Sequence, residues 1–558
     1  MPKKEQFVDI KFQGGLNVDL SPIMLSDEEL AKAKNIDIMS RGGFKKRLGT
    51  EPFNDSSYDD IVKQIIPFPR DDGSEDILAI IGDEIEEIEG DNSGVSLKID
   101  NDRVPHFFLR DKMFFIDQGN DIFEYDGEHY RKVRPYIYLE NVSGAFDIGE
   151  TVEGEDSEAT AVVDVIEDDN LGVSDVSGEF EINEKIEGND SEATGDIESL
   201  DEGVDETNNL EPIKRCKFAY WHSESMRVFF AGDSEDKSAV YYSEYNDPSF
   251  VKETSKVYPT RADGPVKGLS VLMDAIIVGY RYSNWIWRGV DPKEDAIWEK
   301  LPTSHGPIND DLMTITTNSL TMVSHGGIFA MSPSIIGVPM ENEASSDYIT
   351  NISKDRVNSI LKDVNNPEKM RSIFDSDKDL YMVAYCDEDS DRNNKILAFD
   401  WELKGFSLYD GLEVNDFCQL RNGDVLLASE NYILKMDTGT EDIDTDGDSK
   451  TITMEALTSK YNFDMPFQRK KITRIYVIFK NYGPDHELDI KLYIDNSIEY
   501  EFTVKGDDSD TEIITHREKT TQVGNNFQLE IINDQYSEVE LYGIGFRYTP
   551  VRVGGNKV

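Results

Sequence analysis

The stretch VKGLSVLMDAIIVGYRYSNWIWRG, residues 266–289, is the clearest copy of a unit that recurs through the middle of the chain. Its apolar residues alternate with polar ones or run in short bursts, and the runs are broken at Asp274 and at Tyr282-Ser283-Asn284. Apolar runs of this length between turn residues are typical of antiparallel strands joined by tight turns. The stretch therefore predicts most of one four-stranded sheet.

Comparable units lie at residues 104–133, 213–243, 312–338, 370–409 and 414–436. A small sheet buries its two faces only by stacking on its neighbours, and a spacing of roughly 40 to 50 residues with few helices between is that of propeller blades. Long alternating segments after residue 451 favour a separate sandwich. We expect an all-β fold, namely a β-propeller with an inserted small β-module and a C-terminal β-sandwich domain.

The insertion is rich in Glu, Asp, Gly and Ser and contains a duplicated sequence. VSGAFDIGETVEGEDSEAT, residues 142–160, recurs as VSGEFEINEKIEGNDSEAT, residues 176–194. Each copy supplies one apolar face, and the residues concerned are Phe146, Ile148 and Val152, and Phe180, Ile182 and Ile186. Its acidic faces cannot be buried unpaired, so we expect a peripheral module with a solvated acidic surface.

Changes in composition divide the 558 residues into five parts. Residues 1–55 form a lead segment with a short helix, and residues 56–135 hold the first propeller blades. The duplicated module occupies residues 136–208. The remaining blades, with one packed helix, take up residues 209–440, and the sandwich takes up residues 441–558.

Two helix signals support these divisions. Ser26 and Glu29 have the spacing of a capping box, whose side chains satisfy free amides at a helix start, so a helix is predicted as far as Lys34. The second helix is expected to have Ser353 as its N-cap and one apolar stripe at helical spacing. That stripe consists of Val357, Ile360, Leu361 and Val364.

Charge is the most unusual bulk property. The chain has 57 basic and 112 acidic residues, a formal net charge of −55. Such a surface repels free nucleic acid, so ordinary DNA binding through counterion release is disfavoured, whereas transient passage of DNA past an acidic wall is compatible with it. High solubility or a saline habitat is the alternative explanation of the same acidity.

The cysteines and the apolar runs exclude several classes of protein. Cys216, Cys386 and Cys418 are far apart, without CxxC spacing or a Cys/His cluster, so we expect three small core residues and neither a disulfide framework nor a zinc site. No stretch reaches the roughly 18 apolar residues of a membrane span, so no membrane insertion is expected. The N-terminal residues MPKKEQFVDI lack the pattern of a secretory signal.

Sequence signatures of enzymes are missing. The chain has no GxSxG, no HExxH, no GxxxxGK[ST] and no strand-to-helix GxGxxG, and its seven histidines are scattered. We therefore expect no catalytic residue and no bound organic cofactor. A glycosidase needs only two carboxylates at a set separation, so the sequence leaves that class open.

One candidate metal site lies in the acidic stretch before the sandwich. Asp442, Asp444 and Asp446 have the Asp-x-Asp-x-Asp-Gly spacing that turns carboxylates inward around Ca²⁺. Thr453 stands where the EF-hand carries its final Glu. The alternative is an acidic linker loop without metal.

A resemblance to a known family rests on the order of short motifs near the N-terminus. GGLN at 14–17 is followed by Pro22, by Leu-x-x-x-Glu at 25–29, by Ala-x-Asn at 33–35, by Gly-Gly at 42–43 and by Lys-Arg-x-Gly at 46–49. This order resembles the opening of tail nozzle, or tail hub, proteins of short-tailed bacteriophages. YYSEYNDP at 241–248, HGGIFA at 325–330 and LAFDWELKGFSLYD at 397–410 are similar to later blades of that family.

The resemblance implies a structural virion protein and not an enzyme. Such a protein forms a homo-oligomeric ring, expected to be a hexamer, that extends the DNA-ejection channel below the portal and the adaptor. It holds tail fibres or tip proteins, and double-stranded DNA passes without tight binding. The implied location is the virion tail, after assembly in the host cytoplasm, and the lead segment is expected to make ring or adaptor contacts.

The alternative hypothesis is a β-propeller lectin or glycan hydrolase at a virion or cell surface. The chain's 25 Tyr and 5 Trp are enough to line a glycan groove, although blade cores use most aromatic residues in a propeller. Oligomeric state separates the two hypotheses.

Overall fold

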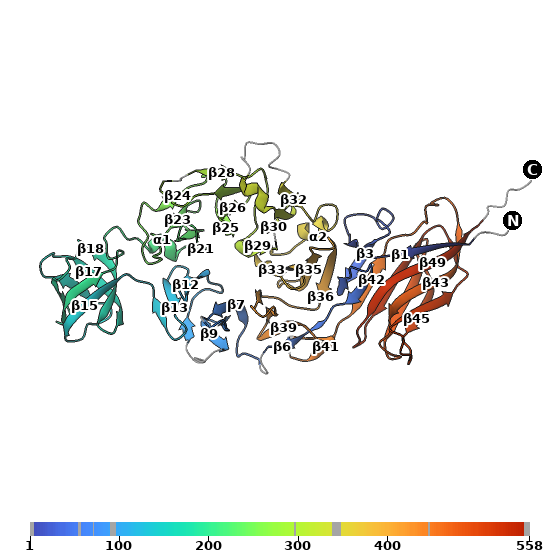
Figure 1. Ribbon diagram of the computed structural model, residues 1–558, viewed down its shortest axis with the longest axis horizontal. Helices are drawn as coiled ribbons and strands as arrows, with labels where there is room; N and C mark the ends of the chain where they lie inside the picture. Colours follow the sequence, from blue (N-terminus) through green and yellow to red (C-terminus); the bar gives the residue numbers. More distant parts are fainter. Residues whose placement is uncertain are drawn as a thin grey trace, which may run out of the picture.

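The computed structural model describes residues 5–53, 57–70, 72–89, 96–294, 297–317, 319–337, 348–444 and 447–551. The described chain forms a propeller with a closed barrel at one end and a β-sandwich at the other (Figure 1). The expected fold class, a propeller with an inserted β-module and a C-terminal sandwich, is confirmed.

Six four-stranded sheets stand separately, and a seventh four-stranded unit continues into a larger sheet. The first five separate sheets follow one another along the chain. They are β7 (Val62–Pro69), β8 (Glu75–Ile81), β9 (Glu84–Glu89) and β10 (Ser96–Lys98); β11 (His106–Leu109), β12 (Lys112–Asp117), β13 (Asp121–Tyr125) and β14 (Tyr130–Lys132); β21 (Phe218–His222), β22 (Arg227–Ala231), β23 (Val240–Tyr242) and β24 (Lys256–Val257); β25 (Val266–Leu272), β26 (Ala275–Tyr280), β27 (Ser283–Trp287) and β28 (Trp298–Lys300); and β29 (Met313–Thr316), β30 (Ser319–Ser324), β31 (Gly327–Met331) and β32 (Ile349–Asn351).

The last two blades complete the ring. They are β33 (Arg371–Asp375), β34 (Leu380–Tyr385), β35 (Lys395–Asp400) and β36 (Phe406–Asp410), and β37 (Asp416–Gln419), β38 (Val425–Ser429) and β39 (Tyr432–Thr438). From β11 to β37 the first strands of successive blades contact one another, and β37 contacts β7. The outer strand of the last blade is β6 (Gly49–Pro52), which pairs antiparallel with β39. An N-terminal strand therefore closes the ring of blades.

Blade cores hold the aromatic and cysteine residues as the sequence predicts. Trp287 is fully buried between two blades, and Trp285 packs against the same cluster. All three cysteines are free and buried. Apolar residues on both faces of each sheet thus pack against the neighbouring blades.

The N-terminal strands do not form a unit of their own within the described residues. β1 (Gln6–Ile10), β4 (Ile36–Ile38) and β5 (Phe44–Lys46) join the sandwich sheet of β43 (Lys470–Lys480), β46 (Ile513–Lys519), β47 (Val523–Gly524) and β49 (Glu540–Pro550). β2 (Gly15–Leu16) and β3 (Glu29–Lys34) lie between β36 and β42 (Met454–Thr458), which leads on to β48 (Phe527–Asn533), β44 (Glu487–Ile494) and β45 (Ser497–Lys505). One ten-stranded sheet therefore runs from the sixth blade into the sandwich.

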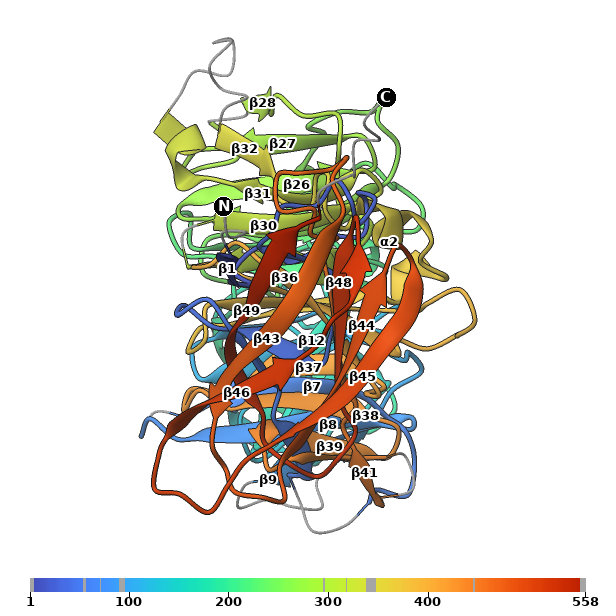
Figure 2. The ribbon, with the colours of Figure 1, turned by 90° about the vertical axis from the view of Figure 1, so that its right-hand side faces the viewer.

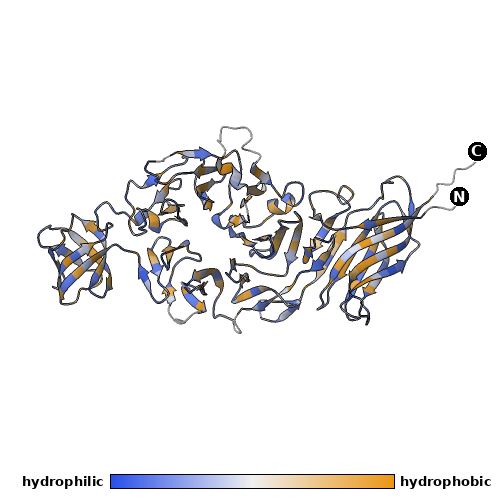
Figure 3. Ribbon diagram, viewed as in Figure 1, coloured by the Kyte–Doolittle hydropathy of each residue, from blue (hydrophilic) through white to orange (hydrophobic). Residues whose placement is uncertain are grey.

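The two sandwich sheets face each other across a shared apolar core (Figure 2). Hydrophobic and hydrophilic residues alternate along their strands (Figure 3), so that one face of each sheet meets the core and the other meets solvent. A small hairpin, β40 (Glu441–Ile443) and β41 (Ser449–Thr451), lies against β6 at the entrance to this domain.

The predicted helix between Ser26 and Lys34 is wrong, because residues 29–34 form strand β3. One of the two hydrogen bonds of a capping box is present, because the Ser26 amide donates to Glu29 Oε2 at 2.9 Å. A register shift between Leu30 and Lys32 marks a bulge in the pairing with β42. Because a bulge breaks the period of two, Leu30 and Ala33 are both buried, and their spacing of three imitates a helix.

The later helix is present but shorter than the pattern suggests. α2 spans Asn358–Lys362, and Leu361 is buried while Ile360 packs against the same core. The N-cap prediction is wrong, because Ser353 Oγ lies 2.8 Å from the Ile328 amide that donates to it. The other short helices are α1 (Glu211–Lys214), η1 (Asp310–Leu312), η2 (Pro333–Gly337) and η4 (Pro367–Lys369).

The duplicated module folds as a closed barrel. Its strands are β15 (Tyr136–Ser143), β16 (Thr151–Gly154), β17 (Thr160–Glu167), β18 (Asn170–Ser177), β19 (Lys185–Gly188) and β20 (Thr194–Leu200). Four of the six predicted apolar positions are buried: Phe146, Val152, Phe180 and Ile186. Ile148 and Ile182 are exposed, and each lies in a turn between two strands.

The two repeats hold each other together through buried carboxylates. Glu150 accepts hydrogen bonds from the amides of Asp190 and Ser191 and from the Ser191 hydroxyl, at 3.2, 3.0 and 2.8 Å. Glu184 accepts the equivalent three bonds from the first repeat, from Asp156 and Ser157, at 3.2, 3.0 and 2.9 Å. The glutamate of each repeat thus binds a loop of the other repeat.

Excising residues 137–200 and bridging the ends with a short Gly-Ser linker should leave the propeller folded. The barrel has its own core, and the Asp201 amide donates to the Tyr136 carbonyl at 3.0 Å, so the two ends lie together. All five tryptophans lie outside the barrel, and their fluorescence reports propeller unfolding. We expect a cooperative transition like that of the full chain. An insoluble variant, or one that loses this transition, would show that the barrel belongs to the propeller core.

Candidate functional site

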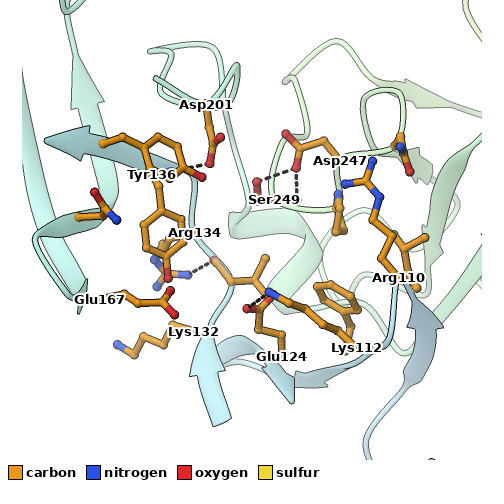
Figure 4. A pocket seen from close by; sticks show the side chains of 17 residues that line it. Arg110, Lys112, Glu124, Lys132, Arg134, Tyr136, Glu167, Asp201, Asp247 and Ser249 are labelled. Carbon is orange, nitrogen blue, oxygen red and sulfur yellow. Dashed lines mark hydrogen bonds and ion pairs between the residues drawn. The ribbon is translucent and has the colours of Figure 1, made fainter. Parts of the chain in front are cut away.

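A cavity of about 520 Å³ lies where the barrel meets the propeller (Figure 4). Three parts of the chain line it: the second blade, the barrel and the turn Asn246-Asp247-Pro248. The barrel contributes residues of β15, the ends of β17 and β18 where they join, and the residue that follows β20. The volume falls in the range of roughly 300 to 1,000 Å³ that is common for small-molecule sites. The cavity exists only because the module is inserted after β14.

Two tyrosines form one wall of the cavity. In β15 the residues alternate between the two faces of the barrel, so Ile137 and Leu139 enter the barrel core while Tyr136 and Tyr138 point outward. The two ring centroids are 6.1 Å apart, with an angle of 32° between the planes. The half-buried rings present an aromatic surface to the cavity.

Most charged groups around the cavity are paired. Lys112 binds Glu124 at 2.6 Å across the second blade. Arg131 reaches from β14 to Glu167 of the barrel at 3.1 Å. Arg134 is buried and lies 2.7 Å from Asp121. These ion pairs fix the wall and the relative position of barrel and blade.

Three charged residues remain outside the described ion pairs. Asp201 accepts the Tyr136 amide at 2.9 Å, and Asp247 accepts the amide and hydroxyl of Ser249 at 2.9 and 2.6 Å. Burial raises the pKa of Asp201, the Tyr136 hydrogen bond lowers it, and the charge of Asp247 raises it again, with a net increase. Arg110 is exposed in the turn between β11 and β12 and lines the same cavity (Figure 4).

A second cavity, of about 360 Å³, lies among the innermost strands on the propeller axis. Arg103 is bound there to Asp311, before β29, and to Asp416, on β37, with both distances 3.1 Å. Arg371 of β33 approaches Asp311 at 3.3 Å. Ion pairs from several blades therefore occupy the axis.

Two neighbouring carboxyls on this axis have opposite pKa shifts. Burial raises the pKa of Asp310 to about 7, although the Leu269 amide donates to it at 2.6 Å. Burial also acts on Asp311, but the charges of Arg103 and Arg371 outweigh it and lower its pKa. Asp310 can therefore hold or release a proton near neutral pH, whereas Asp311 stays ionised.

The structure describes two of the three residues of the predicted calcium site. Asp442 is buried in β40, where Arg47 binds both of its carboxylate oxygens. Asp444 accepts the Asp448 amide at 2.9 Å, and Asp446 lies outside the described residues. Within the described part of the chain no cluster of three or more acidic, His or Cys side chains is arranged to hold a metal ion. Calcium binding stays a prediction.

Sequence reasoning did not single out Tyr136, Tyr138 or Asp201. A usable signal was present in Tyr-Ile-Tyr-Leu at 136–139, since alternation there places both tyrosines outside a module whose apolar residues fill its interior. Residues 246–248 belong to the stretch YYSEYNDP, whose local pattern carries no sign of a cavity. Its closeness to Tyr138 depends on the path of the chain through the barrel.

Comparisons with known proteins give no family. No family model and no curated protein matches the chain. Sqt1 of Saccharomyces cerevisiae has a TM-score of 0.36 and 11% identity, and the match covers 70% of this chain and 97% of that chain. The Pan2 WD40 domain of Neurospora crassa has a TM-score of 0.27 and 10% identity, and the match covers 72% of this chain and 97% of that chain.

A further solved structure is an exo-β-1,3-galactanase from Phanerochaete chrysosporium, with a TM-score of 0.22, 7% identity, and coverage of 80% of this chain and 95% of that chain. Likenesses this weak carry no argument about this protein, and its own sheet topology establishes the propeller. Among the described helices none is both long enough and apolar enough to cross a membrane.

Proposed function

We propose that this chain is a structural virion protein of a short-tailed bacteriophage, the subunit of a tail nozzle or hub. Six copies form a ring that extends the DNA-ejection channel below the portal and adaptor, and the ring holds tail fibres or tip proteins. The ring is assembled in the host cytoplasm, remains in the virion tail and has no catalytic role. The ordered motifs at 14–49, 241–248, 325–330 and 397–410 support this proposal.

The observation that carries the proposal is the ten-stranded sheet that joins the sixth blade to the sandwich. Strands β2 and β3 insert between β36 and β42, so backbone hydrogen bonds run unbroken from one body to the other. A connection of this kind resists hinge motion far better than a linker does. A ring that bears load during DNA ejection needs subunits of that stiffness.

The axis of the propeller also bears on the path of the DNA. Arg103 forms ion pairs with Asp311 and Asp416 across that axis, so charged side chains of the propeller occupy part of it. In the proposed assembly DNA passes through the lumen of the ring. Its acidic subunits keep the duplex mobile by repulsion and do not bind it.

The second candidate function is that of a lectin or glycan hydrolase. The observation that favours it is the axial pair Asp310 and Asp311, because two carboxyls that differ in protonation near neutral pH are what acid–base hydrolysis of a glycoside requires. A hydrolase of this kind has no need to form a ring, and assembly therefore distinguishes the candidates.

Ring assembly should increase with salt. Each subunit has a net charge of −55, and the Debye length falls from about 10 Å at 0.1 M to about 3 Å at 1 M, so salt weakens repulsion between neighbours. We expect mass photometry to show mainly monomers at low ionic strength and a growing population of closed rings as NaCl or Mg²⁺ rises. Sucrose at matched osmolality is the control and should leave the distribution unchanged.

Negative-stain images of the same samples should show rings of one size. Compact monomers at every salt concentration, both alone and with the adaptor protein of the same virus, would rule out the nozzle and leave the second candidate.

A further inference from the structure

The cavity between barrel and propeller has the construction of a ligand site. Its walls come from strands and not from loops alone, because Tyr136 and Tyr138 lie on β15 while Lys112 and Glu124 lie on β12 and β13. The ion pair between Arg131 and Glu167 ties the two walls together. Side chains held in this way keep their positions when no ligand is bound.

The aromatic wall suits a flat, partly apolar ligand. An outward-facing tyrosine on a barrel is ordinarily free to contact solvent on all sides, but here two of them share one half-buried surface inside a cavity. Tyrosine offers an apolar ring face and a polar hydroxyl at little cost in conformational entropy. The C–H face of a pyranose ring packs well against such a surface.

The polar groups suit a ligand with many hydroxyls. Asp201 and Asp247 offer carboxylate oxygens that no described Lys or Arg engages in an ion pair, and Arg110 offers donors. A hydroxyl both donates and accepts, so a sugar can use carboxylate and guanidinium together.

We propose that this cavity binds an uncharged saccharide. The rings of Tyr136 and Tyr138 pack against the sugar, Asp201 and Asp247 accept hydrogen bonds from its hydroxyls, and Arg110 donates to its oxygens. This site is distinct from the axial cavity, and it belongs to a single subunit whether or not that subunit forms a ring.

The charges around the cavity select against ionic ligands. An anion would meet the carboxylates of Asp201 and Asp247, which form no ion pair among the described residues, and a cation would meet the guanidinium of Arg110. The remaining charges, on Lys112, Glu124 and Glu167, are already used in ion pairs with protein partners. A neutral ligand avoids repulsion from either set.

The test uses the full-length protein and a microarray of neutral oligosaccharides, followed by saturation-transfer NMR of the best binders. N-acetylglucosamine, glucosamine and N-acetylneuraminic acid serve as matched neutral, cationic and anionic monosaccharides. Tyr136→Ala/Tyr138→Ala is the site variant, and Tyr138→Phe keeps the ring while removing one hydroxyl. Tyr282→Ala, at an exposed tyrosine in the β26–β27 turn, is the control.

We expect saturable binding of at least one neutral saccharide, weakened about tenfold or more by the double alanine variant and unchanged by Tyr282→Ala. Tyr138→Phe keeps the aromatic ring and should therefore retain part of the affinity. Such a result would show that the double alanine variant loses binding because the rings are missing and not because the protein unfolds. The proposal is overturned if no neutral saccharide binds, if the cationic or anionic sugar binds more tightly than the neutral one, or if the double variant binds as the unmodified protein does.

Discussion

Replacing Arg47 with Met should lower the free energy of unfolding by about 3–5 kcal/mol, because Asp442 would be left as a buried charge without its cation. Arg47 and Asp442 are both about 3% exposed, and two hydrogen bonds of 2.8 and 2.6 Å join them. Arg47 Nε also donates to Asn35 at 2.9 Å. This one side chain therefore connects the N-terminal strands to the hairpin beside the last blade.

Denaturant unfolding followed by tryptophan fluorescence measures the effect, since all the tryptophans are in the propeller. The double variant Arg47→Met/Asp442→Leu should recover much of the loss, because an apolar pair of similar volume leaves no buried charge. Lys98→Met, which breaks the exposed pair with Asp83, is the matched control and should leave stability nearly unchanged, because solvent screens that pair. A loss no larger than this control's would show that the buried pair does not hold the last blade closed.

Replacing both Glu150 and Glu184 with Ala should unfold the barrel and leave the propeller intact. Each carboxylate is nearly fully buried and accepts three hydrogen bonds from the opposite repeat. Hydrogen bonds to a charged group contribute about 1.5–3 kcal/mol each, so either single substitution should cost about 3 kcal/mol or more. The double loss is large for a domain of this size, whose total stability is about 5–15 kcal/mol.

Hydrogen exchange of peptides from residues 136–200 reports the barrel, and tryptophan fluorescence reports the propeller. The two single variants should lose protection to the same degree, because the repeats make equivalent contacts. Glu153→Ala and Glu187→Ala, at equivalent exposed positions on β16 and β19, are the matched controls. Unequal single effects, or controls as damaging as the buried pair, would contradict this account.

The same two carboxylates give the barrel a defined response to acid. Burial by itself would raise the pKa of Glu150 and Glu184, but the hydrogen bonds they accept outweigh it, so both pKa values lie below the usual 4.5. Their contribution to stability is therefore complete above pH 4.5 and is lost as the pH falls through the lowered values. The alanine variants should show a smaller change in barrel stability across that range.

The local sequence pattern predicted most of the propeller because the strands that pair within one blade follow one another closely in the sequence. In residues 266–289, alternation and turn residues specify three strands of one four-stranded sheet without reference to distant parts of the chain. Pairing of distant segments produced the error at Glu29–Lys34. There β42, more than 400 residues away, supplies the hydrogen bonds that a helix would otherwise make internally, and the bulge gives a helical spacing to a strand.

The local sequence pattern could not predict the candidate sugar site, because distant segments of the chain come together to form it. Tyr138 and Asp247 are more than a hundred residues apart, and the barrel between them decides that they line one cavity. The acidic motif at Asp442 also has a partner far away in the sequence. Its spacing fits a calcium loop, yet Arg47, a residue assigned to the lead segment, forms the buried ion pair with its first carboxylate.

The N-terminal strand that closes the ring of blades also determines when that ring can form. Arg47 and Asp442 are 395 residues apart, and β6 meets its partner β39 across a similar separation. At a synthesis rate of roughly 5–20 residues per second, β6 leaves the ribosome tens of seconds before β39 exists. Blades with local pairing can form in that interval, whereas closure and attachment of the sandwich wait for the end of translation. The first strands to be made are thus the last to find their partners.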